Sequence, residues 1–325
     1  MLAIIGGAGY IGSHICKLLR EQGVAHVIFD NLEKGHRESI PGSDLVLGDI
    51  RNRQDLENLF ATHKITGVMN FAAYIEVGEG QSQPSEFYWN NTVGMLNVLD
   101  AMRAHGVGCL VFSSTAATYG EPQYVPIDEK HPQLPTNTYG ATKLAVERIL
   151  SDYETAYGIR SVCLRYFNAA GSDPDGVLGE DHSPESHLIP RAILAALGSV
   201  PPLKIFGTDY DTPDGTCLRD YVHVMDLASA HLLAMNHLLA GGSSRRYNLG
   251  NGTGFSVREV VEAVDRVVGR PVPREDAPRR AGDPARLVAS SEAIRAELGW
   301  SPKFPDLETI VQHAWNWRKA HPNGY

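Results

Sequence analysis

The sequence predicts an α/β protein that combines a doubly wound parallel sheet with a smaller, mixed α/β C-terminal domain. The first observation is a series of short apolar runs in the first half: "LAIIGG", "HVIFDN", "LVLGDI", "GVMNFAA", "CLVFSSTAATYG" and "SVCLRYFNAAG". Each run is too short for a helix and is rich in Val, Ile, Leu or Phe. This is typical of strands that are buried on both faces of a sheet.

The second observation is that amphipathic stretches such as "DLENLFATH" and "NNTVGMLNVLDAMRAHG" separate these runs. Strands that alternate with helices predict right-handed βαβ units, and therefore a parallel sheet with helices on its two faces.

The third observation is a change of pattern after Gly171, where the polar segment "SDPDGVLGEDHSPESHLIP" is rich in Asp, Pro and Gly. Such a long segment inside a compact protein is typical of a functional lid or lobe. The helical "HLIPRAILAAL", the strand-like "PLKIFG" and a helix that Ser256 would cap follow it. We expect a first domain over 1–167, to which the chain returns near 221–249, and a second over most of 168–325.

Composition narrows the class of protein. The chain has 325 residues, 43% of them hydrophobic, and a formal net charge of -9. It contains no Lys/Arg run, so nucleic acid is not an expected partner. The four cysteines are scattered, which favours buried thiols in a reducing compartment. No apolar stretch approaches the roughly 20 residues that span a bilayer. We therefore expect a cytoplasmic protein with no membrane partner.

A glycine motif, "GGAGYIG", contains Gly6, Gly9 and Gly12 directly after the first strand and before a helix. Glycines there let the backbone approach a pyrophosphate at the helix N-terminus, which predicts a Rossmann-like dinucleotide site. The alternative is a tight turn that binds nothing.

Acidic and small residues follow the next strands. Asp30 ends the second strand, where a carboxylate accepts hydrogen bonds from a ribose and repels a 2′-phosphate, so NAD is favoured over NADP. Asp30 could instead cap the following loop. The third strand is followed by Asp49-Ile50, and the fourth by Phe71-Ala72-Ala73. At these strand ends we expect contacts with adenine and ribose. Tight packing is the alternative for the alanines.

A tyrosine and a lysine stand one helical turn apart in "NTYGATKLAVE", at Tyr139 and Lys143. We expect the cation, together with an oxidised nicotinamide, to lower the pKa of the tyrosine so that it serves as an acid/base. Thr115, at the end of the Ser/Thr-rich fifth strand, would hold the substrate oxygen in line. The alternative for the tyrosine and lysine is an ordinary surface pair. The alternative for Ser113, Ser114 and Thr115 is that they are polar residues that end a strand.

These motifs resemble those of the extended short-chain dehydrogenase/reductase family. Longer strings, among them "IFGTDYDTPDGTCLRDYVHVMDLA" and "RRAGDPARLVAS", resemble the branch of that family that epimerises UDP-hexoses at carbon 4. The resemblance implies NAD as cofactor, a UDP-hexose as substrate, a 4-keto intermediate, and Tyr139, Lys143 and Thr115 as catalytic residues.

The resemblance also implies two sets of binding residues. The cofactor set is Gly6, Gly9, Tyr10, Ile11, Gly12, Asp30, Asn31, Asp49, Ile50, Phe71, Ala72, Ala73, Asn91, Tyr139, Lys143, Tyr166 and Phe167. The substrate set is Thr115, Asn168, His187, Leu188, Lys204, Phe206, Arg219, Arg280 and Asp283. Two alternatives concern arginines: Arg219 could pair with Asp220, and Arg280 could belong to a solvated turn. We expect no metal, and interpret His182, His187 and His223 as loop or core residues.

The sequence also departs from the family pattern. Thr115 stands where many members have serine, which keeps the hydroxyl. Ile75 stands where some have lysine, and His187 replaces an asparagine of some members. Leu287 falls where some members have a bulky tyrosine, which leaves room for an N-acetyl group and suggests that UDP-N-acetylglucosamine is also accepted.

Two competing functions remain. A sugar-nucleotide 4,6-dehydratase or decarboxylase would use the same scaffold, but dehydratases carry an Asp-Glu pair where this chain has Ala116-Ala117. A non-catalytic NAD-binding protein usually lacks the tyrosine or the lysine. The family further implies a homodimer through helices at 90–105 and 140–157, although a monomer core would explain their amphipathic stripes equally well.

Overall fold

The computed structural model describes residues 1–280 and 283–325, and its largest feature is a sheet of seven strands. The strands lie in the order β11-β6-β5-β4-β1-β2-β3, and all neighbours are parallel. Their bounds are β1 Leu2–Ile5, β2 His26–Asp30, β3 Leu45–Leu47, β4 Gly67–Asn70, β5 Cys109–Thr115, β6 Arg160–Tyr166 and β11 Arg245–Leu249. The predicted doubly wound sheet is confirmed, and every apolar run singled out above contributes one of its strands.

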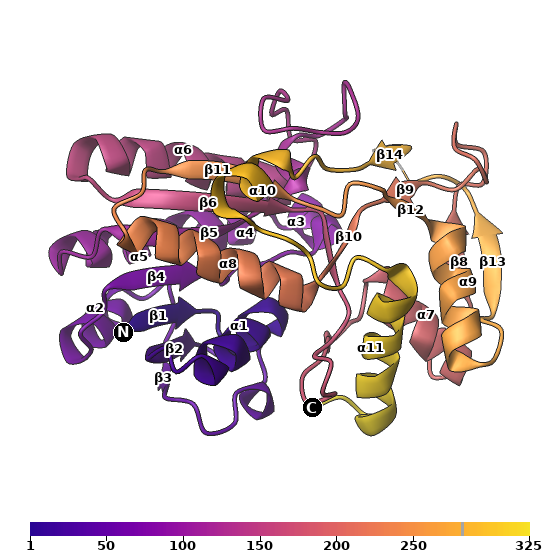
Figure 1. The fold of residues 1–325 in the computed structure, drawn as a ribbon, viewed down its shortest axis with the longest axis horizontal. Coiled ribbons are helices and arrows are strands. Elements are labelled where there is room, and N and C mark those ends of the chain that lie inside the picture. Colours follow the sequence, from indigo (N-terminus) through magenta and orange to yellow (C-terminus); the bar gives the residue numbers. More distant parts are fainter. Residues whose placement is uncertain (281–282) are drawn as a thin grey trace.

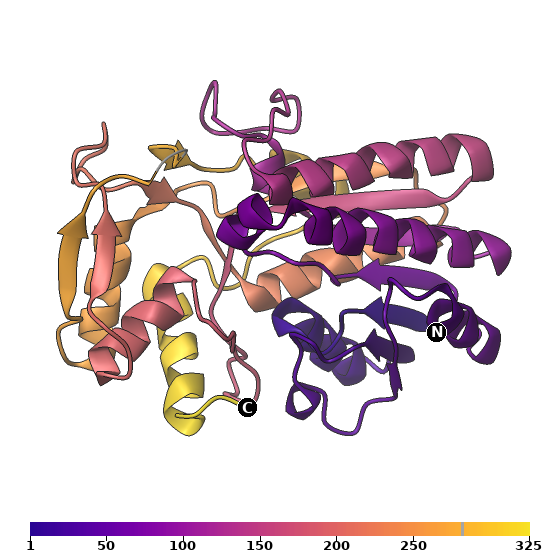
Figure 2. The same ribbon diagram turned by 180° about the vertical axis from the view of Figure 1, so that it is seen from behind.

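Helices cover both faces of this sheet. They are α1 Tyr10–Glu21, α2 Arg53–Thr62, α3 Val77–Ser82, α4 Pro84–Phe87, α5 Gly94–Ala104, α6 Thr138–Tyr157, α8 Val224–Leu239 and α10 Glu292–Leu298. Helix α8 lies in front of the sheet in Figure 1, whereas α5 and α6 lie in front in Figure 2, which shows the opposite side. The two faces therefore bury separate apolar clusters.

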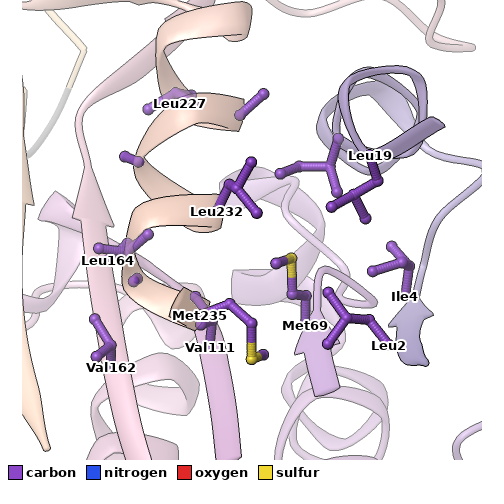
Figure 3. Close-up of a cluster of buried hydrophobic side chains, with 14 of the residues drawn as sticks. Leu2, Ile4, Leu19, Met69, Val111, Val162, Leu164, Leu227, Leu232 and Met235 are labelled. Carbon is purple, nitrogen blue, oxygen red and sulfur yellow. The ribbon is translucent and has the colours of Figure 1, made fainter. Parts of the chain in front are cut away.

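One of these clusters lies between the sheet and helices α1 and α8, and it contains Leu19, Leu227 and Met235 (Figure 3). The other lies against α2, α5 and α6 and contains Leu56, Val98 and Val146. Burial on both faces explains why the strands are continuously apolar.

The helix expected over 90–105 begins differently. Residues Tyr88–Val93 form a π-helical turn, and α5 follows from Gly94. The wide turn holds Asn91 inward, where its side chain accepts a hydrogen bond from Tyr74 N (2.8 Å) and donates to Tyr74 O (3.0 Å). The amphipathic pattern of the sequence does not predict this π-helical turn, because the turn depends on the contact of Asn91 with Tyr74, 17 residues earlier in the chain.

Smaller sheets and three helices form most of the C-terminal half, at the opposite end of the molecule from α2 (Figure 1). The elements are β7 Asn168–Ala170, β8 Leu203–Phe206, β9 Leu218–Arg219, β10 Tyr221–His223, β12 Phe255–Ser256, β13 Arg274–Ala277, β14 Arg286–Leu287, α7 Leu188–Leu197, α9 Val257–Val268 and α11 Leu307–Ala320. Parallel and antiparallel pairs both occur among them. Ser256 caps α9 as predicted, in a capping box with Glu259.

Two further sequence expectations concern burial and membranes. Cys16, Cys109, Cys163 and Cys217 are all buried free thiols. Across the described ranges 1–280 and 283–325, none of the helices combines the length and the apolar character that a bilayer crossing requires.

A buried ion pair joins α6 to strand β6 of the sheet. Arg165 on β6 donates from Nε to Glu147 Oε1 on α6 at 2.9 Å, and both side chains are only 2% exposed. Ser114 on β5 donates to the same carboxylate, and Tyr119 accepts a hydrogen bond from Arg165. Burial alone would raise the pKa of Glu147, but the hydrogen bonds and charge of Arg165 lower it below its usual value.

Replacing Glu147 with Gln should therefore lower the free energy of unfolding by about 3–5 kcal/mol, because the Arg165 charge stays buried without a counter-charge. Urea denaturation followed by circular dichroism measures the loss. The matched control is Glu297→Gln, which breaks the Arg245–Glu297 pair, whose side chains are 43% and 45% exposed. That change should cost at most about 1 kcal/mol. Equal losses for the two variants would contradict the structural role given to the buried pair.

Candidate active site

A large cavity opens where the strands of the central sheet end. It has a volume of about 540 Å³, and we call it the main cavity. Its walls come from the glycine loop, the end of β5, the start of α6, the β6–β7 connection, segment 180–187 and the β9 and β14 region. Strands β2 and β3 lie on one side of β1, and β4, β5, β6 and β11 lie on the other, so the order of strands reverses next to β1. In doubly wound sheets this switch point is where ligands bind.

A second, smaller cavity of about 110 Å³ adjoins the first at Gly6 and Gly9, and we call it the side cavity. Asp30, Asn31 and Ile50 line it, together with the end of β4. Most of the predicted cofactor residues line one or both cavities: Gly6, Gly9, Tyr10, Ile11, Gly12, Asp30, Asn31, Ile50, Phe71, Ala72, Ala73, Tyr139, Lys143, Tyr166 and Phe167.

The glycine loop has little room for side chains. Gly6 has φ +77°, and a Cβ on it would lie 2.4 Å from Ala72 N. A Cβ on Gly12 would lie 2.3 Å from Gly6 O. The N-cap of α1, Gly9, offers no side chain to the first N–H groups of the helix. The loop therefore presents backbone donors and a positive helix end to both cavities, which suits the pyrophosphate of a dinucleotide.

Asp30 both caps the loop and faces the side cavity. Its Oδ2 accepts from Ala8 N at 2.9 Å and its Oδ1 from Leu32 N at 2.8 Å. Burial raises the pKa of this carboxyl group, while the two backbone hydrogen bonds oppose the rise. Each carboxylate oxygen can accept a second hydrogen bond, so the two interpretations of Asp30 are compatible.

Two predicted cofactor residues line neither cavity. Asp49 is held by Arg51, whose Nε donates to it at 2.9 Å, and by Asn31 at 3.0 Å. Burial would raise the pKa of Asp49, but these hydrogen bonds lower it to about 2. Asn91 instead clamps the backbone of Tyr74. Both side chains already have partners within the protein.

The tyrosine and lysine lie together at the start of α6. The N-cap Asn137 accepts a hydrogen bond from Gly140 N at 2.8 Å. A Cβ on Gly140 would lie 2.3 Å from Ala117 O, so glycine lets α6 approach the end of β5 closely. As a result Tyr139, Lys143 and Thr115 all line the main cavity. Lys143 Nζ donates to Ser113 O at 2.8 Å and lies 5.8 Å from the centre of the Tyr139 ring.

The expected lowering of the tyrosine pKa includes an oxidised nicotinamide, and in the protein alone the pKa shifts the other way. Burial raises the pKa of Tyr139 to about 12, although a hydrogen bond with Thr115 opposes the rise. Burial also lowers the pKa of Lys143 to about 7, against the charge of Glu147. Close to neutral pH the lysine is thus only partly charged, and it faces a carbonyl rather than the phenol. Stabilising a phenolate requires another positive charge in the cavity.

Arginines line the opposite wall. Arg219 pairs with Asp283 (2.7 Å) and also donates to Pro284 O (2.8 Å). The alternative pairing with Asp220 is therefore wrong, since that carboxylate accepts from the backbone N–H groups of Asn251, Gly252 and Ala289. The guanidinium carbon of Arg280 lies 3.9 Å from the centre of the Phe206 ring.

The predicted substrate residues divide into two groups. Those that line the main cavity are Thr115, Asn168, His187, Arg219, Arg280 and Asp283. Leu188, Lys204 and Phe206 do not line it. Lys204 is 58% exposed and lies 3.9 Å from Glu275, whereas Phe206 contributes through the ring beneath Arg280. In the string "RRAGDPARLVAS", residues 281–282 lie outside the described part of the chain.

Sequence reasoning missed several residues of the main cavity, among them Lys34, Glu76 and Glu180. Lys34 and Glu76 lie 3.7 Å apart, and both line the main cavity together with Ile75, the position where some family members have lysine. The alternating Glu and His residues of "GEDHSPESH" were a usable signal for Glu180. His223, by contrast, caps α8 by accepting from Met225 N, and it contacts His313.

Comparison with known proteins agrees with this architecture. The model of the NAD dependent epimerase/dehydratase family matches residues 2–250 of this chain. A UDP-glucose 4-epimerase of Halalkalibacterium halodurans is 56% identical over 100% of this chain and 97% of its own. The Brucella ovis UDP-glucose 4-epimerase, solved in complex with NAD, has a TM-score of 0.95 and 47% identity over 97% of both chains. The UDP-glucose 4-epimerase of Bifidobacterium longum, solved in complex with NAD+ and UDP, has a TM-score of 0.94 and 37% identity. The match covers 100% of this chain and 99% of that one.

The matched family covers the glycine loop, the tyrosine and lysine of α6 and the whole of the parallel sheet. On these grounds the chain belongs to the NAD dependent epimerase/dehydratase family.

Proposed function

We propose that this protein uses NAD to interconvert UDP-glucose and UDP-galactose by inverting carbon 4 of the hexose. The observation that carries the proposal is the position of Tyr139, Lys143 and Thr115 in a cavity that also contains the glycine loop and two arginines. The similarity to UDP-glucose 4-epimerases over the full chain supports the choice of substrate.

In the proposed reaction Tyr139 takes the proton of the sugar 4-hydroxyl and later returns it. When bound, NAD supplies reversible hydride transfer at carbon 4. Thr115 would orient the 4-oxygen through its hydroxyl, and Lys143 would add positive charge beside the phenol. Loss of the hydride from carbon 4 and of the proton from its hydroxyl gives a 4-keto sugar. Return of the hydride to the other face of carbon 4, and of the proton to the oxygen, gives the epimer with no net oxidation.

The substrate must be held firmly at one end only, because the keto-hexose has to turn over between the two hydride transfers. Arg219 and Arg280 are suited to the diphosphate, since a guanidinium group offers paired donors to phosphate oxygens. The side chain of Asn168 also faces the main cavity. We propose that residues 168–325 supply most of the UDP-sugar contacts and residues 1–167 most of the NAD contacts.

Elimination chemistry is the second candidate, and the residues after Thr115 argue against it. Ala116 and Ala117 both line the main cavity at the positions where a dehydratase needs acidic side chains. A methyl group cannot protonate a leaving hydroxyl.

We also propose a cytoplasmic homodimer. Large apolar side chains are exposed near the predicted helices: Tyr88 is 43% exposed, Trp89 is 53% and Tyr157 is 50%. They stand beside α5 and at the end of α6, and pairing of these helices with a second copy would cover them.

The purified protein should convert UDP-galactose into UDP-glucose without added cofactor, because a cofactor regenerated in each cycle need not dissociate. Coupled detection of UDP-glucose measures the conversion. If no product forms even after NAD is added, the proposed substrate is wrong.

Replacing Tyr139 with Phe should reduce kcat by about 10²–10⁴-fold, since the proton acceptor is lost, while NAD remains bound. Turnover assays and the NAD content of the purified variant measure the two effects. The control is Tyr153→Phe on the same helix, which loses only a hydrogen bond to Asp100. A Tyr139 variant with normal turnover would overturn the assigned role.

UDP-N-acetylglucosamine should also be a substrate, because Leu287 lines the main cavity and is smaller than the tyrosine that some family members have there, which would leave space for an N-acetyl group. Filling that space with Leu287→Tyr should reduce its turnover at least ~10-fold more than that of UDP-galactose. Steady-state rates with both substrates measure the ratio. Absence of any N-acetylhexosamine turnover at millimolar concentration, with UDP-glucose turning over well, would refute the idea.

A further inference from the structure

A group of two histidines and two glutamates lies in the wall of the main cavity. Glu180, His182, Glu185 and His187 each direct one ligand atom inward, and these four atoms lie within 4.8 Å of one another. Three of the four residues, Glu180, His182 and His187, also line the main cavity. The proposed reaction assigns no step to this group as a unit.

The polar atoms of the group are buried, and the charged partners that the structure gives them are one another. Glu180 is 6% exposed, and so is the side chain of Glu185. Glu180 Oε1, His182 Nδ1, Glu185 Oε2 and His187 Nδ1 are all buried without a hydrogen bond. Buried polar atoms are normally hydrogen-bonded, and four that converge on one point without a well-formed hydrogen bond suit a common partner held between them.

The distances fit a small divalent cation as that partner. Zinc ligands lie about 2.0–2.2 Å from the metal, so neighbouring ligand atoms of a tetrahedral site are about 3.4 Å apart. His182 Nδ1 lies 3.4 Å from Glu180 Oε1 and 3.6 Å from Glu185 Oε2. His187 Nδ1 lies 3.4 Å from Glu185 Oε1 and 2.8 Å from Glu180 Oε1. All four ligand atoms lie within 4.8 Å of one another, so a modest contraction of the group would give tetrahedral spacing around one ion.

The chemistry of the donor set selects the class of metal. Two imidazoles and two carboxylates suit a borderline ion such as Zn²⁺ better than Mg²⁺ or Ca²⁺, which prefer oxygen ligands alone. The backbone supports the ligands: Glu185 Oε1 accepts from Ser186 N and His187 N at 2.8 Å each, which fixes that carboxylate.

We propose that Glu180, His182, Glu185 and His187 bind one Zn²⁺ ion, which fixes segment 180–187 against the start of α7. From the sequence alone, we interpret His182 and His187 as loop or core residues. That interpretation considers the spacing of the histidines alone and leaves out Glu180 and Glu185. Four protein ligands are typical of a structural zinc site. The ion would hold the wall of the main cavity beside Tyr10, whose ring centre is 6.2 Å from that of His182.

Equilibrium dialysis of the chelator-treated protein against Zn²⁺, followed by metal analysis, tests the proposal. About one Zn²⁺ should remain per chain. The Glu180→Gln/His182→Gln double variant should lose it, and Co²⁺ bound to the wild type should give a visible absorption band that this variant lacks. The control is His105→Gln, which removes a His–Glu pair (2.7 Å) that belongs to no group of three or more possible metal ligands among the described residues, and it should bind like the wild type.

A wild-type protein that retains no Zn²⁺, or a double variant that binds as much as the wild type, would overturn the proposal. If the double variant does not fold by circular dichroism, Glu185→Gln alone, which keeps the shape of the side chain, decides in the same way. The readout is metal content, so it is independent of the sugar nucleotide that the protein acts on.

Discussion

The buried pair of Glu147 and Arg165 fixes the position of α6, and the chemistry of the site depends on that position. Tyr139, Lys143 and Glu147 follow one another at intervals of four residues, so they share one face of the helix. Glu147 is anchored at the sheet by Arg165 and Ser114. Its negative charge also opposes the loss of charge from Lys143 that burial causes. One carboxylate thus places the helix and tunes the lysine.

The two walls of the main cavity differ in how they are built. The wall around Tyr139 and Gly6 comes from strand ends and a helix start, and close backbone contacts at Gly6, Gly12 and Gly140 leave it little freedom. The opposite wall comes from loops and two-residue strands, and it holds its arginines through side-chain contacts such as Arg219 with Asp283. A rigid wall suits a reaction that needs precise hydride transfer, and a more adaptable wall suits the binding of a flexible nucleotide sugar.

Much of the fold could be predicted from the sequence, because buried parallel strands are continuous apolar runs and the loop before α1 needs glycine. The location of Tyr139, Lys143 and Thr115 in one cavity also followed from motif order. The protonation of Tyr139 and Lys143 in the protein alone could not be predicted from motif order. Burial, which depends on the whole fold, shifts both pKa values more than a neighbouring charge does. The partner of Arg219 could not be read from its neighbours either, because Asp283 is 64 residues away and Asp220 is used by the backbone. Asp49 and Asn91 fail as cavity residues for the same reason: each already has a partner within the protein.

The low pKa of Lys143 has a chemical consequence for the protein before any cofactor binds. At about 7 this pKa leaves a large fraction of the side chain as a neutral amine at physiological pH. A neutral amine is a nucleophile, and Lys143 faces a cavity that admits small molecules. A molecule that occupies the main cavity would therefore cover this amine and separate it from reagents in the solvent.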